Sequence, residues 1–368
     1  MKKIVFGITN LSLGGAERVL VDIVNELVKK YDITIFTLYG NGEFEKQLHK
    51  NIKVISVYNK TYNELNSFTK KVISIKLVTK FLRKKIYNKF IKGKYDVEVA
   101  FLEGPVTWIF AEGDCSKKIA WIHNDIEDVF GKGKNALLKQ KLNEKSYNKF
   151  NNLVFVSNDN LEKFCKFFPF NTVKKQVIYN YLDVKSVVQK ANKFEAKEIN
   201  SDIVSFVQVS RIVEQKALFR LLDVHKKLIT DGYMHNIYVI GDGPLKNELV
   251  KKINEYKVND SFILLGKKEN PYPYIKKGNY FMLTSFYEGY PMVLLEAKAL
   301  NKPIMITDSA ARETLLDYDS SLIVENSEKG IYEGIKSLLN KKKTVKKVVN
   351  NTNDEILKKI ISLIEGEV

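Results

Sequence analysis

Cysteine and long apolar runs are both scarce in this sequence of 368 residues. The two cysteines, Cys115 and Cys165, lack the spacing of a metal site. This usage excludes a disulfide-rich scaffold and is typical of a reducing cytoplasm. No run of about 18 apolar residues occurs, so we expect no membrane-spanning segment. The apolar residues 4–8 are too few for a secretory signal, and we predict that they form a first β-strand.

Acidic residues are too few to balance the basic ones. There are 60 Lys and Arg against 43 Asp and Glu, a net charge of +17, which favours an anionic partner. Residues 70–94 contain ten basic residues and no acid, with apolar residues at helical spacing. We predict a basic amphipathic helix that contacts anionic lipid, each charge adding about 1 kcal/mol. Its expected membrane contacts are Lys76, Lys80, Arg83, Lys84 and Lys85. The alternative is an ordinary domain helix with solvated lysines.

Short apolar runs alternate with amphipathic helical patterns, which is typical of parallel sheets with crossover helices. In the first half we expect strands at residues 4–8, 33–38, 53–57, 97–101, 118–122 and 152–156, and a short one within 177–183. The polar and charged residues 185–202 are the best linker candidate. Further strands are then expected at residues 203–209, 236–240, 261–265, 280–284 and 303–307. Two successive doubly wound α/β domains are the prediction.

Two glutamates, Glu288 and Glu296, flank an expected strand-to-helix loop. Pro291 suits the first turn of a helix. The unpaired amides of residues 289–292 would then point to the carboxyl end of the strand, where open α/β sheets bind ligands. A carboxylate accepts two hydroxyls at once, so Glu288 fits sugar hydroxyls and Glu296 a ribose diol. The alternative is a pair of solvated acids.

Arg211 and Lys216 flank another loop of this kind, between strand 203–209 and a helix at residues 217–228. Two cations at this sheet edge could neutralise a diphosphate leaving group, which is the main electrostatic task in glycosyl transfer. Exposed basic residues are common on loops, so the pair is weak evidence by itself.

Two segments of the first half also follow strands. Gly14-Gly15 comes after the first strand, where glycine lets the backbone approach a ligand and the helix start offers amides to phosphate. His123 directly follows the strand expected at residues 118–122 and could serve as a hydrogen-bond partner or proton relay. The alternative for His123 is an imidazole satisfied by local loop groups.

Together these segments resemble the family-four retaining glycosyltransferases of the GT-B fold, over nearly the whole chain. The firmest match is the Glu-x7-Glu spacing of Glu288 and Glu296, with Gly289 and Pro291 between them. The resemblance implies two Rossmann-like doubly wound domains facing across a cleft. We place an acceptor domain at residues 1–182, a nucleotide-sugar domain at 183–352, and a C-terminal helix at 353–368 that packs back toward the first domain.

The resemblance also implies roles for individual residues. Glu288 would contact the donor sugar and Glu296 the nucleotide ribose, while Arg211 and Lys216 would stabilise the departing diphosphate. His123 would touch the sugar from the first domain. The remaining donor contacts would be Gly14, Gly15, Gly266, Lys267, Gly289, Tyr290, Pro291 and Met292.

The function implied is a cytoplasmic retaining hexosyltransferase, peripheral at the inner face of the plasma membrane. It would move a hexose or N-acetylhexosamine from a nucleotide-sugar, with UDP-sugars favoured, to a lipid-linked or cell-surface polysaccharide precursor. No cofactor or metal is expected; Asp317-Tyr318-Asp319 looks like a metal-binding Asp-x-Asp, but we interpret it as a surface turn. The alternatives are a protein or small-molecule acceptor and a non-catalytic sugar-binding subunit. Nucleic acid is not an expected partner, because no reading motif accompanies the charge.

Overall fold

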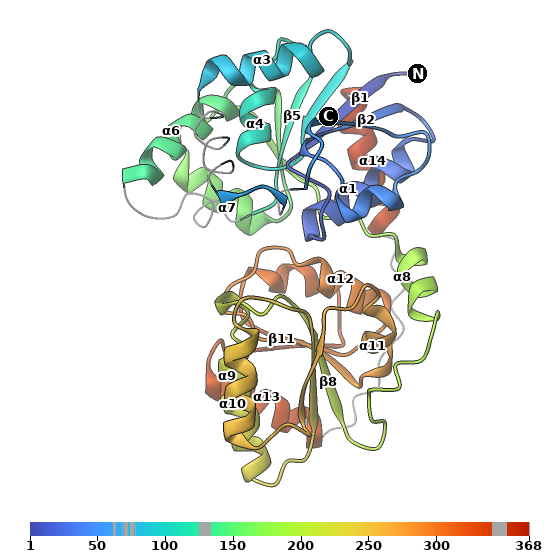
Figure 1. Ribbon diagram of the computed structural model, residues 1–368, viewed down its shortest axis with the longest axis vertical. Helices are drawn as coiled ribbons and strands as arrows, with labels where there is room; N and C mark the ends of the chain where they lie inside the picture. Colours follow the sequence, from blue (N-terminus) through green and yellow to red (C-terminus); the bar gives the residue numbers. More distant parts are fainter. Residues whose placement is uncertain are drawn as a thin grey trace. The chain divides into compact units, whose positions relative to one another are not determined.

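The computed structural model describes residues 1–61, 64–67, 69, 73, 77, 79–124, 134–340 and 352–367. The chain divides into two compact units, each an α/β domain (Figure 1). Unit 1 consists of Met1–Leu182 together with Thr352–Val368, and unit 2 of Asp183–Asn351. The predicted class, two parallel-sheet α/β domains, is confirmed. Within the described residues, no helix is both long and apolar enough to cross a bilayer.

Seven parallel strands form the sheet of unit 1, as far as its residues are described. Their spatial order is β3-β2-β1-β4-β5-β6-β7. The strands are β1 (Lys3–Ile8), β2 (Asp32–Tyr39), β3 (Lys53–Tyr58), β4 (Val97–Ala100), β5 (Lys118–Ile122), β6 (Asn152–Phe155) and β7 (Lys174–Val177). The helices are α1 (Gly15–Leu27), α3 (Lys80–Phe90), α4 (Pro105–Phe110), α6 (Lys134–Tyr147), α7 (Asn158–Phe167) and α14 (Thr352–Glu365), with a 3-10 turn η1 (Glu43–Gln47).

The central strands β1, β2, β4, β5 and β6 are buried along most of their length, as expected for a parallel sheet covered by helices. Side chains of α3, α4, α6 and α7 share one apolar cluster with β1 to β6, including an edge-on contact of Phe36 with Phe110 at 5.8 Å between ring centroids. The C-terminal helix α14 belongs to the same unit. Its Glu365 accepts hydrogen bonds from Lys2 Nζ at 2.5 Å and from the Tyr31 hydroxyl at 2.6 Å. These bonds tie the end of the chain to its beginning.

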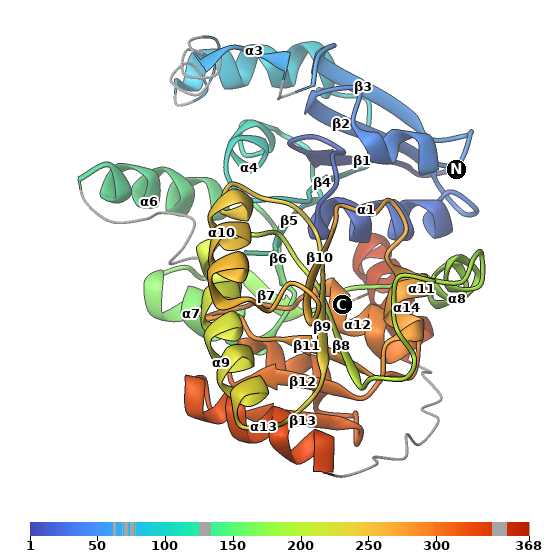
Figure 2. The ribbon, with the colours of Figure 1, turned by 60° about the horizontal axis from the view of Figure 1, so that its bottom comes forward.

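Six parallel strands form the sheet of unit 2 within its described residues, in the order β10-β9-β8-β11-β12-β13. The strands are β8 (Ser205–Val209), β9 (Asn236–Ile240), β10 (Phe262–Gly266), β11 (Tyr280–Leu283), β12 (Ile304–Thr307) and β13 (Ser321–Val324). Helices α9 (Leu218–Thr230), α10 (Lys246–Tyr256) and α13 (Glu328–Asn340) pack together on one face (Figure 2). Helices α8 (Val184–Ala191), α11 (Tyr272–Lys277) and α12 (Met292–Ala299) pack on the other.

Two local predictions differ from the structure. The expected linker begins with helix α8, because Asp183 caps it by accepting the Ser186 amide at 2.9 Å and Val187 and Ala191 are buried. The short strand expected within residues 177–183 lies earlier, at Lys174–Val177. The edge strand β13 was not predicted, since its four residues are only partly buried and give a weak apolar signal.

Candidate active site

The strand order of each sheet reverses at one place, between β1 and β4 in unit 1 and between β8 and β11 in unit 2. Crossovers leave such a switch point toward opposite faces, so a crevice opens at the carboxyl ends of the two strands. Three predicted segments follow these strands: Gly14-Gly15 after β1, residues 211–216 after β8, and residues 288–296 after β11. Each unit therefore carries candidate residues at its own switch point.

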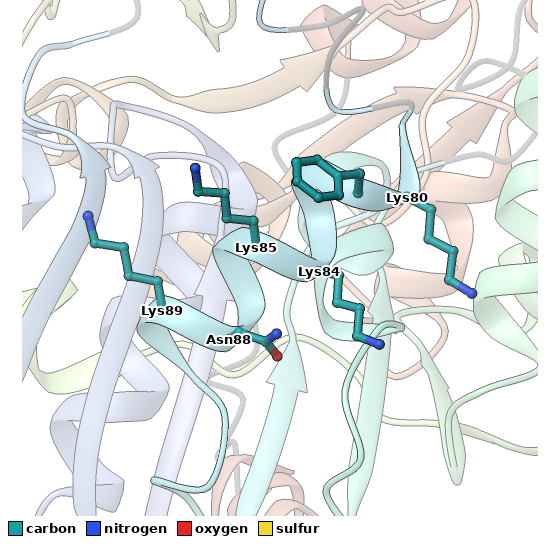
Figure 3. A pocket seen from close by; sticks show the side chains of 6 residues that line it. Lys80, Lys84, Lys85, Asn88 and Lys89 are labelled. Carbon is teal, nitrogen blue, oxygen red and sulfur yellow. The ribbon is translucent and has the colours of Figure 1, made fainter.

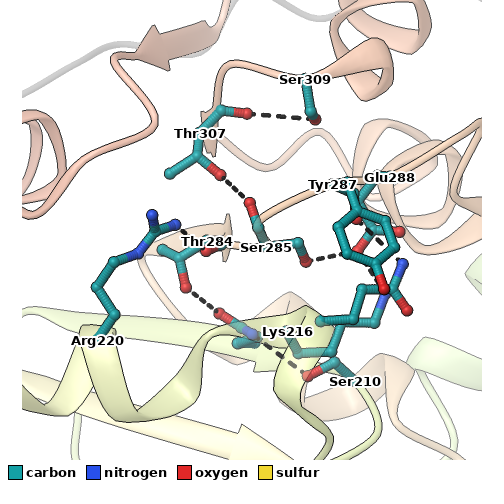
Figure 4. A network of polar contacts seen from close by, with 11 residues as sticks. Ser210, Lys216, Arg220, Thr284, Ser285, Tyr287, Glu288, Thr307 and Ser309 are labelled. Atoms are coloured by element: carbon teal, nitrogen blue, oxygen red, sulfur yellow. Dashed lines mark hydrogen bonds and ion pairs between the residues drawn. The ribbon is translucent and has the colours of Figure 1, made fainter.

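Glu288, Lys216 and Ser285 form a polar cluster at the switch point of unit 2 (Figure 4). Lys216 Nζ makes an ion pair with Glu288 Oε1, and Ser285 Oγ donates to the same oxygen at 2.5 Å. The side chains of Lys216 and Glu288 are only 14% and 8% exposed. Charges so far from water require partners to offset the lost hydration. The structure thus brings together two residues that the sequence placed on separate loops.

The loop that carries Glu288 is held to the neighbouring loop by Gln215, in the 3-10 turn η3 (Glu214–Lys216). The carbonyl of Gln215 accepts the Phe286 amide at 2.9 Å, and its side-chain amide donates to the Tyr287 carbonyl at 3.0 Å. Glu288 therefore keeps its place through backbone contacts as well as through Lys216.

Arg220 and Asn326 support the same loop from α9 and from the segment after β13. The Arg220 guanidinium donates to the Thr284 carbonyl and to Asn326 Oδ1, each at 2.8 Å, and lies 4.4 Å from the Phe286 ring centroid. Asn326 Nδ2 donates to the Phe286 carbonyl at 2.8 Å. Sequence reasoning missed both residues, because their partners lie 40 to 106 positions away along the chain.

The other donor candidates of the β8 and β11 loops lie near this cluster in the chain. Arg211 is exposed, and no ion pair is found for it among the described residues. Gly289, Tyr290 and Pro291 are half-buried, and α12 begins at Met292 directly after Pro291. The helix start therefore follows Glu288 closely and offers backbone amides there.

Glu296 lies in the second turn of α12 and accepts a hydrogen bond from the Tyr272 hydroxyl at 3.0 Å. Gly266 ends β10 with φ +71, a left-handed conformation that favours glycine, and its carbonyl accepts the Gly241 amide at 2.9 Å. Lys267, the next residue, is exposed.

In unit 1, Gly14 precedes α1 and Gly15 is its first residue. A Cβ atom on Gly14 would lie 2.2 Å from Glu17 Oε2, so this position requires glycine or a displaced Glu17. Gly15 is exposed, so the backbone at the start of α1 is open to solvent where the sequence predicted a phosphate contact.

His123 follows β5 and packs between aromatic rings. Its imidazole centroid is 4.7 Å from that of Phe101 and 6.5 Å from that of Trp121. Part of the residue is exposed, but Nε2 is buried without a hydrogen-bond partner among the described residues. Burial lowers the pKa of His123, so the imidazole is neutral at pH 7.

Glu103, which sequence reasoning missed, fixes the backbone at His123. Its carboxyl group accepts the His123 amide, the Asn124 amide at 2.7 Å and Asn124 Nδ2 at 3.1 Å. The residue is 6% exposed, and burial raises its pKa. The available signal was a single acid directly after β4, in Phe101-Leu102-Glu103-Gly104, at the switch point of the sheet.

The predicted basic helix corresponds in part to α3, and Lys76 lies outside the described residues. Lys80, Lys84 and Lys85 are exposed, and with Phe81, Asn88 and Lys89 they line a pocket on α3 (Figure 3). The prediction for Arg83 is wrong. Arg83 is 5% exposed, because its guanidinium is paired with Glu112 at 2.9 Å in the interior of unit 1. Phe81 was not predicted as exposed, yet 81% of its surface is open.

Comparison with known proteins identifies the class of enzyme. Residues 189–355 match the family described as glycosyl transferases group 1. The chain is 26% identical over 349 residues to a Campylobacter jejuni enzyme, N-acetylgalactosamine-N,N'-diacetylbacillosaminyl-diphospho-undecaprenol 4-alpha-N-acetylgalactosaminyltransferase, covering 92% of this chain and 90% of that one. It is 24% identical over 357 residues to the capsular polysaccharide biosynthesis glycosyltransferase CapH of Staphylococcus aureus, covering 94% and 93%.

Solved structures share the fold. HepE of Anabaena in complex with UDP and glucose superposes with a TM-score of 0.72 at 16% identity, over 99% of this chain and all of that one. Sucrose-phosphate synthase of Thermosynechococcus elongatus gives a TM-score of 0.74 at 14% identity, over 100% and 98%. The fold is therefore that of the GT-B glycosyltransferases. The chain is a glycosyltransferase whose residues 189–355, nearly all within unit 2, match the group 1 glycosyl transferases.

Proposed function

We propose that this glycosyltransferase moves a hexose or N-acetylhexosamine from a UDP-sugar to a lipid-linked or cell-surface polysaccharide precursor, with retention at the anomeric carbon. The observation that carries the proposal is the buried pair of Lys216 and Glu288 at the switch point of unit 2. A cation and a carboxylate side by side match a ligand that combines a diphosphate with sugar hydroxyls.

The chemistry requires that negative charge be stabilised on the leaving group. The bond between the anomeric carbon and the diphosphate oxygen breaks, and its electron pair leaves with the nucleoside diphosphate. The acceptor hydroxyl oxygen bonds to the same face of that carbon, and its proton passes to the departing diphosphate. Lys216 and the exposed Arg211 supply positive charge at the carboxyl end of β8. Because these cations serve the leaving group, we propose a metal-independent reaction, whose rate a chelator would leave unchanged.

Glu288 has two tasks in this scheme. Without donor it holds Lys216 in place, and with donor it accepts sugar hydroxyls while Lys216 turns to the diphosphate. Ser285, which donates to Glu288 at 2.5 Å, keeps the carboxylate in position during this exchange. In unit 1, the neutral His123 would hydrogen-bond a sugar hydroxyl through Nε2, which is buried and has no partner among the described residues.

Retention and a lipid-linked acceptor are supported by what the relatives do. Two Campylobacter jejuni relatives, 26% and 25% identical to this chain, form α linkages on undecaprenyl diphosphate saccharides. An α-linked nucleotide-sugar that gives an α-linked product implies retention. The UDP bound to HepE makes a UDP-sugar the first donor to test, with GDP-mannose as the rival.

We also propose that α3 rests on the cytoplasmic face of the membrane, where such an acceptor resides. Lys80, Lys84, Lys85 and Lys89 are exposed on this helix and line one pocket with Phe81, a residue that is 81% exposed. Lysines attract anionic headgroups, and an aromatic ring among them enters the interface.

A donor panel tests the enzyme activity. UDP- and GDP-sugars are incubated with a polyprenyl-diphosphate saccharide, and nucleotide release and the anomeric configuration of the product are measured. We expect acceptor-dependent UDP release and an α-linked product. Release independent of every acceptor tested, or a β-linked product from an α-linked donor, contradicts the proposal.

Liposome flotation tests the membrane contact separately. Binding to vesicles with anionic lipid should drop at least tenfold when Lys80, Lys84 and Lys85 are changed to Gln, since each charge contributes about 1 kcal/mol. The matched control changes three exposed lysines of unit 2 to Gln: Lys227, Lys251 and Lys257. If both triple variants lost vesicle binding equally, the loss would reflect the lower net charge of the protein. That result would overturn the role of α3.

A further inference from the structure

Glu296 is oriented by a tyrosine from a different helix. The Tyr272 hydroxyl donates to Glu296 Oε1 at 3.0 Å, joining the first residue of α11 to the second turn of α12. The two helices pack against each other on one face of the unit 2 sheet. Tyr272 is 6% exposed, and its amide donates to Asn270 Oδ1 at 3.3 Å. Burial of the side chain and the amide hydrogen bond therefore both restrict the position of Tyr272.

A phenol is a suitable group for orienting a carboxylate that must bind hydroxyls. It donates one hydrogen bond and carries no charge, so the carboxylate is not neutralised. A carboxylate has about four acceptor positions, so it can accept a phenol and ligand hydroxyls at the same time. Glu296 is half-buried on a helix, and an unrestrained glutamate there would sample several rotamers. Ordering such a side chain on binding weakens affinity about twofold to tenfold.

We propose that Tyr272 is a positioning residue that fixes Glu296 for the two ribose hydroxyls of the donor nucleotide. This inference rests on the proposed function, together with the sequence prediction that Glu296 binds the ribose of the donor nucleotide. Tyr272 itself contacts Glu296, and its effect on the nucleotide passes through that carboxylate.

The same helix provides a matched control. Tyr274, two residues after Tyr272, is 4% exposed, and its hydroxyl donates to Glu198 Oε1 at 2.8 Å. Glu198 precedes β8 in the chain and belongs to no predicted donor contact. Tyr272→Phe and Tyr274→Phe therefore each remove one phenol-to-carboxylate hydrogen bond from α11, and only the first bond involves Glu296.

The experiment measures the Kd of the full-length protein for UDP and for an analogue that lacks both ribose hydroxyls. Calorimetry is done on the wild type, Tyr272→Phe, Tyr274→Phe and Glu296→Ala, with thermal melting of each. We expect Tyr272→Phe to weaken UDP binding about threefold to tenfold and to leave the Kd of the analogue unchanged. Glu296→Ala should weaken UDP further, and Tyr274→Phe should match the wild type.

Three results would overturn the inference, and they separate it from the function beneath it. If Tyr272→Phe binds UDP normally while Glu296→Ala binds it more weakly, Tyr272 has no positioning role, and the ribose role of Glu296 stands. Equal weakening of UDP and of the analogue by Tyr272→Phe assigns the tyrosine a merely structural role. Normal UDP binding by Glu296→Ala removes the ribose role and the inference together.

Discussion

The two units share one doubly wound plan but present different electrostatics at the carboxyl ends of their strands. Unit 2 presents a charged pair, Lys216 and Glu288, with both side chains less than 15% exposed. Unit 1 presents His123, an imidazole kept neutral by burial, and anchors its backbone with the buried Glu103. The loops, rather than the sheets, make this difference.

The difference indicates how the work is divided. A buried cation beside a carboxylate fits a ligand that brings its own negative charge, as a diphosphate does. A neutral imidazole whose buried Nε2 has no hydrogen-bond partner in the described part of the chain fits an uncharged hydroxyl instead. We therefore expect substitutions in unit 2 to act first on donor binding, and those in unit 1 on the transfer step.

Loss of the charged pair should have the largest effect. Glu288→Ala removes the proposed sugar contact and leaves Lys216 without its ion-pair partner, so kcat/KM for donor turnover should fall about 10²- to 10³-fold. Nucleotide release at saturating acceptor measures it. Glu214→Ala, which removes an exposed acid of the neighbouring loop that carries Lys216, is the control and should stay within about twofold. If kcat/KM fell by similar factors in Glu288→Ala and Glu214→Ala, Glu288 would have no specific role in donor turnover.

A second prediction concerns two histidines of unit 2 that serve structure rather than the site. His225 and His235 are buried and hydrogen-bonded to each other at 2.9 Å. Burial lowers the pKa of His225 to about 3 and also lowers that of His235. The unfolded chain therefore binds more protons below pH 6.5, and the free energy of unfolding falls as the pH drops from there toward 3.

The His225 contribution should be about 2 kcal/mol between pH 6.5 and pH 5, at about 1.4 kcal/mol for each pH unit. Urea denaturation at both pH values measures it, comparing the wild type with His225→Leu. The variant should lose that part of the pH dependence, although it is less stable throughout. An unchanged pH dependence would show that His225 is not kept neutral by the fold.

Glu103→Gln should have the smallest of these effects. It should lower kcat through the His123 turn of unit 1 without changing UDP binding. The amide nitrogen of glutamine would face Asn124 Nδ2, and the turn at His123 would lose a charged acceptor, so kcat should fall about tenfold. The Kd of UDP should stay within about twofold. A roughly tenfold lower kcat with normal UDP binding supports the division between the units, whereas weakened UDP binding contradicts it.

Much of the fold was predictable because its signals are local. Apolar runs between helical patterns located most strands to within two residues. A local capping signal is also present at Ser157, which precedes α7 and accepts the Asn160 amide. Glu288 and Lys216 were predicted because each follows a strand end, where the chain's topology brings loops together.

The supporting residues were not predictable, because their partners are distant in the sequence. Glu103 acts on an amide 20 positions away, and Tyr272 on a carboxylate 24 positions away. Arg83 shows the opposite error. Its charge pattern indicated a surface, but a single glutamate at position 112 makes burial possible. Pairings of this kind depend on the tertiary fold and leave no periodic trace.

The affinity for UDP of three full-length proteins tests the division between the units most directly. Calorimetry would compare the wild type with Lys216→Met and His123→Ala. We predict that Lys216→Met weakens UDP binding at least tenfold, because the buried Glu288 then faces the diphosphate without its cation, while His123→Ala stays within about twofold. Unchanged UDP affinity in Lys216→Met, or a tenfold loss in His123→Ala, would contradict the account.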